Sequence, residues 1–248
     1  MTVCTPISLA IALILPLLPL PALAGTWTPP EGCAPYLTVQ GKACRVSHHY
    51  TCIGDAPGDQ WRVDMDQEGP FFYSRIDREG QWLESYDPIL QTLDPNPIDR
   101  SSFSQLLAAG IDTLDFTLSK KDGTGSRAAG YDRLTGEIVV IDGVTLQQTE
   151  VAFTEYDRGG AVLRRARGTE YISADWRLFF AGPGETDLGD GQWLPIDGSP
   201  VEFVFPGEDG FLSAQPKYDC DVLSAGATPA PTQIPIPTPI LPASRSKP

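Results

Sequence analysis

The stretch from Gly136 to Ser173 constrains the fold of this chain more than any other part of the sequence. Ile138–Ile141 is an apolar run of β-branched residues, and residues 144–156 and 161–172 are two long segments of strand-forming composition. Asp157–Gly160 lies between them and contains the glycines of a tight hairpin turn, since glycine tolerates positive φ. An isolated hairpin is only marginally stable in water, so we expect the rest of the chain to complete a sheet around it.

Most of the remaining sequence predicts short strands separated by turns. Trp61–Asp66 alternates cleanly, which places Trp61, Val63 and Met65 on the face that we expect to be inward. Strands joined by short turns favour antiparallel pairing over βαβ units. The fold class predicted is therefore mainly β: a single curved antiparallel sheet or open β-barrel (half-barrel) with one short helix. The other predicted strands are Leu37–Val39, Ala43–Cys52, Phe71–Ile76, Gln81–Tyr86, Ile111–Ser119, Trp176–Phe180, Trp193–Ile196, Val201–Phe205 and Phe211–Gln215.

The one predicted helix spans Ser101–Ala109. Ser102 and Gln105 form a capping-box pattern, and Gly110 is suited to end the helix. Two segments, 87–99 and 182–191, are rich in proline or glycine and are predicted to be irregular. The apolar helix side chains expected to face the sheet are Phe103, Leu106 and Leu107.

The two ends of the chain differ from the part between them. Residues 1–24 contain an apolar, proline-interrupted run that ends in Ala22-Leu23-Ala24, which predicts a cleaved secretory signal. Gly25–Glu31 is expected to be a short mobile leader. Residues 25–225 are expected to form one β-rich domain, and residues 226–248 a proline-rich disordered tail.

The acidic balance of the chain limits its partners. The 248 residues include 32 Asp and Glu against 18 Lys and Arg, a formal net charge of −14. Such an excess of negative charge disfavours nucleic acid and anionic membrane surfaces as partners. After the signal, no apolar run is long enough to span a bilayer, so we expect a soluble periplasmic or secreted protein with no membrane span.

Four of the five cysteines remain after removal of the signal: Cys33, Cys44, Cys52 and Cys220. An even number in an exported chain predicts two disulfide bonds, and three pairings are conceivable. If residues 44–52 form one strand, its ends lie about 26 Å apart at ~3.3 Å per residue, which disfavours a bond between them. Cys220 then bonds to Cys44 or Cys52, or to Cys33 if the segment turns back.

The residues that carry catalysis or metal binding are sparse. The only histidines are His48 and His49, and neighbours on a strand point to opposite faces, so they do not share a metal ion. We expect one of them to be buried and the other exposed. No Gly-x-Ser-x-Gly elbow of a serine hydrolase occurs. The sequence thus predicts no catalytic residues, no metal site and no cofactor, and favours a protein that is not an enzyme.

Two groups of acidic residues are candidate sites. Asp64 and Asp66 share one strand face, about 7 Å apart, which is within the range for inverting glycosidases. Alternation places them opposite the apolar face, so a solvated surface is the favoured interpretation. The acids of Glu185–Asp190 match no known calcium-loop spacing and are interpreted as a plain acidic loop.

Positive charge is concentrated on the central hairpin, at Arg164, Arg165 and Arg167. These side chains could contact an anionic ligand, since arginine binds carboxylate and phosphate groups. The favoured alternative is structural ion pairing, for which Glu150 or Glu170 could supply the carboxylate. Alternation puts Arg165 and Arg167 on one face and Arg164 on the other.

The sequence carries two resemblances. Four segments, GDQWRVDMDQEGPFFYSRID, SSFSQLLAAGIDTLDF, GYDRLTGEIVVIDGVTLQQTE and FVFPGEDGFLSAQPKYDCD, resemble uncharacterised exported proteins of α-proteobacteria, which implies an extracytoplasmic single domain. Residues 77–88, DREGQWLESYDP, with the helix and strand that follow, are similar to periplasmic lipoprotein carriers of the LolA type. That similarity implies a curved half-barrel with helices on its concave face and binding of acyl chains.

The function expected from these observations is binding rather than catalysis. Curved sheets often hold a ligand in the mouth, so we expect a soluble periplasmic protein that binds a small apolar or amphipathic ligand or an envelope protein. The first alternative is a carbohydrate-binding or sugar-acting protein that uses Trp and acidic side chains. The second is a structural or interaction protein without a small ligand. A concave face lined by apolar side chains would favour the first function, and two facing carboxylates beside Trp would favour the sugar function. A filled interior would favour the structural or interaction protein.

Overall fold

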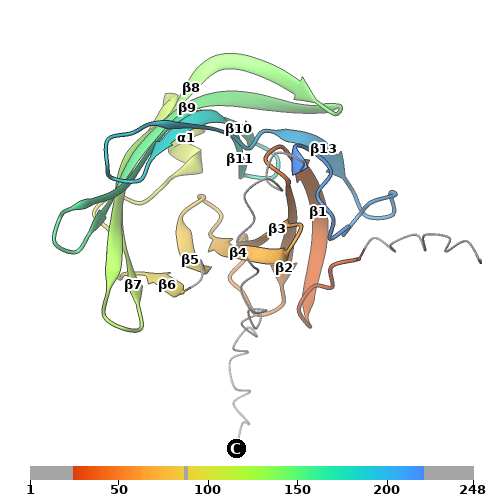
Figure 1. Ribbon diagram of the computed structural model, residues 1–248, viewed down its shortest axis with the longest axis horizontal. Helices are drawn as coiled ribbons and strands as arrows, with labels where there is room; N and C mark the ends of the chain where they lie inside the picture. The colour runs from red at the N-terminus through yellow and green to blue at the C-terminus, as the bar shows by residue number, and fades with distance from the viewer. Residues whose placement is uncertain (1–24, 87–88, 221–248) are drawn as a thin grey trace, which may run out of the picture.

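The fold is a single antiparallel sheet of thirteen strands with one short helix, which confirms the predicted fold class. The computed structural model describes residues 25–86 and 89–220. Figure 1 shows the strands following one another around a curved sheet, with β13 returning to the vicinity of β11. The strands are β1 (Cys33–Gly41), β2 (Arg45–Cys52), β3 (Gln60–Asp66), β4 (Gly69–Ile76), β5 (Trp82–Tyr86), β6 (Leu90–Leu93), β7 (Ile111–Lys120), β8 (Gly125–Ile141), β9 (Val144–Asp157), β10 (Val162–Ser173), β11 (Leu178–Asp187), β12 (Leu194–Asp197) and β13 (Pro200–Val204).

Strands that are consecutive in the chain are neighbours from β1 to β12, and only β13 returns to pair with β1. The longest pair is β8 and β9, and β9 is joined to β10 by the predicted turn. In that turn the Asp157 N–H donates to the Ala161 carbonyl at 2.8 Å, and Gly160 has φ 87°. The predicted hairpin is therefore confirmed, but β10 and β9 lie third and fourth from the β12 edge of the sheet and not at its middle.

The sheet rolls up without closing, because its two ends overlap instead of pairing. Leu37 of β1 is opposite His49 of β2 and lies on the inner, concave face. Phe180 of β11 packs in the same apolar cluster, yet alternation places it on the face opposite Phe179 and Ala181, which face the interior. The inner face of β1 thus covers the outer face of β11. The buried residues of this overlap are Leu37, Val39, Leu146, Leu178, Phe180 and Phe203.

A second apolar cluster, which we call the outer cluster, covers the outer face of β2–β4. Val63 and Met65 belong to it, so the predicted apolar face is buried, but on the convex side of the sheet. The first described residues cover it: Trp27 is 6% exposed, and its N–H donates to the Leu212 carbonyl at 2.8 Å. The prediction of a mobile leader was therefore wrong for this part of the chain. The buried members of the outer cluster are Trp27, Val46, Tyr50, Val63, Met65 and Tyr73.

Helix α1 (Phe103–Ala109) ends where the sequence predicts and is capped at Ser102 as predicted, but it begins at Phe103 and not at Ser101. The Gln105 N–H donates to the Ser102 side chain at 3.2 Å, which caps the first turn. Gly110 adopts φ 77° and its N–H donates to the Leu106 carbonyl at 2.9 Å.

One face of α1 packs on the inner face of the sheet. Phe103 and Leu106 are buried against Ile172 of β10, with Leu134 of β8 beside them. Leu107 is 36% exposed, so the prediction that it faces the sheet was wrong. A helix of seven residues has room for only one narrow buried face, and Phe103 and Leu106 occupy it.

Two segments predicted to be irregular contain strands, and one predicted strand does not form. Residues 182–187 continue β11 instead of forming a loop, because Gly184 pairs with Gly168 of β10 and needs no side chain there. Within the segment predicted to be irregular, residues 90–93 form β6. Residues 211–215 form only a single bridge, between Ser213 and Thr26, and not a strand.

The two disulfide bonds join Cys33 to Cys52 and Cys44 to Cys220. Cys33 and Cys52 are opposite each other in the register of β1 and β2. Cys220 lies in the segment after β13 rather than in a last strand, and ties that segment to the start of β2. Of the three conceivable pairings, this one agrees with the geometric exclusion of a bond between Cys44 and Cys52. Two disulfides are compatible with an extracytoplasmic protein.

The predicted signal at residues 1–24 and the predicted tail at residues 226–248 lie outside the described residues. Within the described ranges, α1 is seven residues long, and no helix has the length and apolar character needed to cross a bilayer.

Candidate functional site

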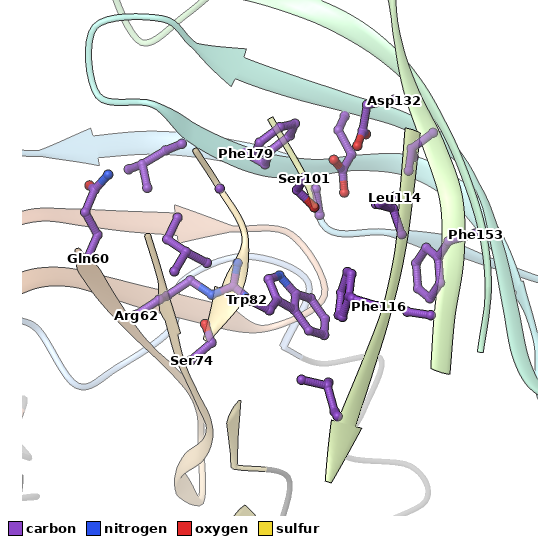
Figure 2. A pocket seen from close by; sticks show the side chains of 18 of the residues that line it. Gln60, Arg62, Ser74, Trp82, Ser101, Leu114, Phe116, Asp132, Phe153 and Phe179 are labelled. Atoms are coloured by element: carbon purple, nitrogen blue, oxygen red, sulfur yellow. The ribbon is translucent and has the colours of Figure 1, made fainter. Parts of the chain in front are cut away.

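A cavity of about 250 Å³ lies on the inner face of the sheet, between β2–β4 and β7–β11. Most of its wall is aromatic or aliphatic, and a small number of polar side chains interrupt it. Figure 2 shows Trp82 and Phe116 lying close together along one side, with Asp132 and Ser101 in another part of the wall. The large apolar side chains of the lining are Ile76, Trp82, Leu114, Phe116, Leu118, Val151, Phe153, Leu178 and Phe179.

Strand register brings two acidic residues of this lining together. Asp132 of β8 is opposite Val151 of β9, which in turn is opposite Gly168 of β10. Glu170 follows two residues after Gly168, so its side chain points to the same face. Asp132 and Glu170 therefore lie in adjacent rows of the inner face, and we call them the acid pair.

The acid pair lies at the end of the cavity that α1 covers. Leu134 is two residues after Asp132 on β8, and Ile172 is two residues after Glu170 on β10. Both Leu134 and Ile172 pack against the helix. The next position on β8 in the opposite direction is Gly130, and the corresponding position on β10 is Gly168. On the side of the acid pair toward the helix, the inner face carries the side chains of Leu134 and Ile172. On the opposite side, Gly130 and Gly168 provide no side chain.

Neither member of the acid pair forms an ion pair among the residues that the structure describes, and Arg62, which acts on Glu170, is itself paired with Asp64. Asp132 is 8% exposed, and its Oδ1 is buried without a hydrogen-bond partner. Glu170 is half-buried, and within residues 25–86 and 89–220 its carboxyl forms no ion pair. Buried carboxylates normally have a cation or several N–H donors beside them, so this arrangement costs folding free energy.

Both carboxyls respond to this environment by holding their protons. Burial, together with the nearby negative charge of Asp112, raises the pKa of Asp132 to about 7. The pKa of Glu170 is raised to about 8, mainly by burial and also by the charge of Asp132, against the opposing effect of Arg62. Asp112 is opposite Asp132 in β7, and its carboxylate accepts the Ser102 N–H at 2.8 Å. The pair loses its protons in coupled steps rather than independently.

The arginines of the cavity wall are engaged by other acids. Arg62 lies 3.1 Å and Arg45 3.7 Å from the carboxylate of Asp64, whose side chain is 2% exposed. The Ser47 hydroxyl also donates to Asp64 at 2.7 Å. The prediction that Asp64 belongs to a solvated face was therefore wrong, because the rolled sheet turns this polar face inward.

Asp66 does not join Asp64 in a catalytic pair. Its carboxylate accepts the N–H groups of Glu68 and Gly69, at 2.7 and 3.2 Å, and so stabilises the turn after β3. In the acidic segment 185–190, Asp187 is fully buried and accepts the N–H groups of Gly189 and Gly191, both at 2.9 Å. Both segments therefore have structural roles in these contacts.

The two histidines point to opposite faces of β2, as alternation predicts, but both are buried. His48 lies in the outer layer, where its Nδ1 is 2.9 Å from the Thr38 hydroxyl and its ring stacks on Trp27. His49 lines the cavity, with its ring edge-on to Phe180 at 5.9 Å. Burial lowers the pKa of His48 to about 4 and of His49 to about 3, so both are neutral at pH 7.

The arginines singled out by the sequence all have carboxylate partners. Arg165 lies 3.2 Å from Asp187, and Arg167 lies 2.7 Å from Glu185 and 4.0 Å over the ring of Trp193. Only Arg164 lines the cavity, where it lies 3.3 Å from Glu155. Neither Glu150 nor Glu170, the two acids expected from the sequence, is among these partners. An anion contact at these three arginines stays a prediction.

Sequence reasoning missed Asp132 and considered Glu170 only as a partner for arginine. One signal was available for Asp132: it alternates with Ala128, Gly130 and Leu134 on a strand face that is otherwise small or apolar. A lone acid on such a face indicates a buried carboxyl. The position of Glu170 beside it depends on the register of three strands, which the sequence does not specify.

No ligand set for a metal ion is found within residues 25–86 and 89–220, since no three His, Cys, Asp or Glu side chains there converge suitably. Comparison of the chain with protein-family models, with curated proteins and with solved structures finds no match. The resemblances to exported α-proteobacterial proteins and to LolA-type carriers therefore stay predictions.

Proposed function

We propose that this protein is a non-catalytic binding protein of the periplasm that holds a small amphipathic molecule in the cavity of the rolled sheet. The observation that carries the proposal is the cavity itself: about 250 Å³ in volume, with an aromatic and aliphatic wall and a few convergent polar groups. Small-molecule sites have this combination, and pockets of ~300 Å³ take ligands at the small end of the range. The disulfides support a location outside the cytoplasm.

The first experiment asks whether the protein carries or accepts such a molecule. Native mass spectrometry of protein purified from the periplasm would reveal a co-purifying ligand as an added mass. Titration with the neutral fluorescent probe N-phenyl-1-naphthylamine would measure binding to the cavity in solution. We expect a retained ligand or probe binding at the cavity. Absence of both would contradict the proposal.

A matched pair of variants locates the bound probe. Ala128 is on the inner face of β8, opposite Phe116, and Ala128→Phe adds a ring to the cavity. The adjacent Ala129 points to the other face, so Ala129→Phe adds the same ring outside the cavity. We expect the probe affinity to fall about tenfold or more in Ala128→Phe and to stay unchanged in Ala129→Phe.

One observation favours a second candidate, a carbohydrate-binding or sugar-acting protein. Trp82 and two carboxyls that hold protons line the same cavity, and glycosidases use a protonated carboxyl as general acid. Calorimetric titration with neutral oligosaccharides tests this candidate. Saturable heat that disappears in Trp82→Ala, without probe binding, would favour the sugar function over the amphipathic one.

A further inference from the structure

The acid pair lines the cavity and forms no ion pair with any residue that the structure describes. We propose that it binds the head group of an amphipathic ligand and selects a ligand that carries a protonated amine. This inference rests on the proposed function, because it names the class of ligand for the same cavity. It is carried by an imbalance of partners: each arginine of the wall forms an ion pair with Asp64 or Glu155, whereas the acid pair forms none among the described residues and the buried Oδ1 of Asp132 has no hydrogen-bond partner.

The charges of the cavity can be counted element by element. From β2 and β3, Arg45 and Arg62 share the carboxylate of Asp64, and Arg62 also acts to lower the pKa of Glu170. From β10, Arg164 is paired with Glu155 of β9. From β7, Asp112 faces the acid pair and adds negative charge. The end of the cavity under α1 therefore has a negative potential when the acid pair ionises, which attracts a cation and repels a carboxylate or phosphate.

Hydrogen-bonding capacity points to the same head group. An ionised carboxyl only accepts hydrogen bonds, and a primary ammonium has three donors and no acceptor. An ammonium placed between Asp132 and Glu170 could donate to both, including to the unpartnered Oδ1 of Asp132. A hydroxyl has one donor only, and a carboxylate head group has none. The ammonium is thus the head group that satisfies both acids at once.

The rest of the cavity suits an apolar body attached to that head group. Phe179 lies on the face of β11 that lines the cavity at the end near α1, and Trp82, Phe116 and Phe153 continue the wall. Aromatic faces attract cations as well as apolar groups, so they tolerate an ammonium that enters past them. The glycines at positions 130 and 168 leave the inner face beside the acid pair without side chains.

Binding of an ammonium should also change the protonation of the acid pair. A positive charge beside a carboxyl favours its ionised form, so the raised pKa values of both acids would fall when the amine binds. At pH 7 the complex would therefore release protons to the solvent. A neutral ligand in the same cavity would release few or none.

The test uses three probes with the same eight-carbon chain: octylamine, octan-1-ol and octanoate. Each is titrated calorimetrically into the full chain at pH 7, in phosphate and in Tris, whose different ionisation enthalpies report the number of protons released. We expect octylamine to bind at least about tenfold more tightly than octanol, octanoate to bind most weakly, and proton release with octylamine only.

Neutral variants of the same shape assign the effect to the acid pair. Asp132→Asn and Glu170→Gln should each reduce the affinity for octylamine about tenfold while changing that for octanol less than about threefold. The matched controls are Glu137→Gln, on an exposed part of β8, and Asp175→Asn, also exposed; both should behave as the unchanged protein. Circular dichroism establishes that each variant is folded.

The outcomes separate this inference from the proposed function. If octanol binds as tightly as octylamine, or octanoate most tightly, the amine site is refuted and the amphipathic cavity stands. If Glu137→Gln lowers octylamine affinity as much as Glu170→Gln, the preference reflects net charge and the site is also refuted. If none of the three probes binds, the amine site fails, and the proposed function fails with it when N-phenyl-1-naphthylamine does not bind and no ligand co-purifies.

Discussion

The outer cluster and the acid end of the cavity are two buried regions of one sheet. Each contains a buried titratable side chain, but the contacts around that side chain differ. In the outer layer, His48 is fully buried, faces the Thr38 hydroxyl at 2.9 Å and stacks on Trp27. At the acid end, Asp132 is 8% exposed and its Oδ1 has no partner among the described residues. The neutral imidazole of His48 is packed against Trp27, although its Nε2 also has no hydrogen-bond partner among those residues, whereas the carboxyl of Asp132 lines an open cavity.

A single strand, β10, carries arginines that form ion pairs and one carboxyl that forms none among the described residues. β10 carries Arg165 and Arg167, which lie against Asp187 and Glu185, and it also carries Glu170. The arginines cluster in the sequence, yet each has an acid across the neighbouring strand. Glu170 is isolated in the sequence and lacks such a partner. The clustered arginines thus have structural partners, while the isolated carboxyl is the group whose pKa is raised, which is the kind of shift that clusters at functional sites.

The largest effect is expected from breaking the outer cluster. Trp27→Ala removes a buried indole that packs on His48 and Tyr50, and should lower the free energy of unfolding by about 3–5 kcal/mol. Urea unfolding followed by circular dichroism measures this. In the control, Trp193→Ala, the exposed stacking of Arg167 is lost and the expected cost is about 1 kcal/mol. Equal losses in both variants would show that Trp27 does not hold the cluster together.

The second effect concerns the acid end and depends on pH. Unfolded chains lose the protons of Asp and Glu near pH 4, whereas the folded protein keeps those of Asp132 and Glu170 up to about pH 7 and about pH 8. The folded state thus binds more protons between these values, so stability from the acid pair falls as the pH rises through that window. Asp132 alone should account for about 2–4 kcal/mol of this loss.

A double variant isolates that dependence from the other carboxyls. Asp132→Asn with Glu170→Gln keeps the shapes and removes the titration, so the difference in unfolding free energy between variant and unchanged protein should grow in favour of the variant from pH 5 to pH 8. Urea unfolding at three pH values measures it. A difference independent of pH would mean that the acid pair is ionised throughout and has a counter-ion.

A smaller effect is expected at the helix that covers the acid end. Ser102→Ala removes the side-chain acceptor for the Gln105 N–H and should cost about 1 kcal/mol. In this variant, backbone hydrogen exchange should become faster in α1 than in the strands of the outer cluster, because the helix has only seven residues. Unchanged exchange in α1 would indicate that packing of Phe103 and Leu106 alone holds the helix in place.

The smallest effect is expected at the paired arginines. Glu185→Gln breaks the ion pair with Arg167, whose side chain is 55% exposed, and should change the free energy of unfolding by less than about 1 kcal/mol. The same measurement at 1 M salt should make even this difference disappear, because salt screens exposed charges. A loss of several kcal/mol would place this pair with the buried groups instead.

Local features of the fold followed from the sequence because they depend on a few neighbouring residues. The turn at Asp157–Gly160 and the caps of α1 at Ser102 and Gly110 are set by glycine conformation and by one side-chain acceptor. The oxidised cysteines followed from their even number. Strand ends were less predictable: β11 continues through Pro183 and Gly184 because β10 pairs with it there.

The sequence by itself determined that this protein is a mainly β chain with two distinct faces on its strands. Only the tertiary structure decided which face encloses the cavity, because alternation distinguishes two sides of a strand but not the direction in which a sheet rolls. The side carrying Arg62 and Asp64 turned inward, since the N-terminal residues around Trp27 covered the other side. The acid pair likewise exists only in the register of β8, β9 and β10, which brings together residues far apart in the chain.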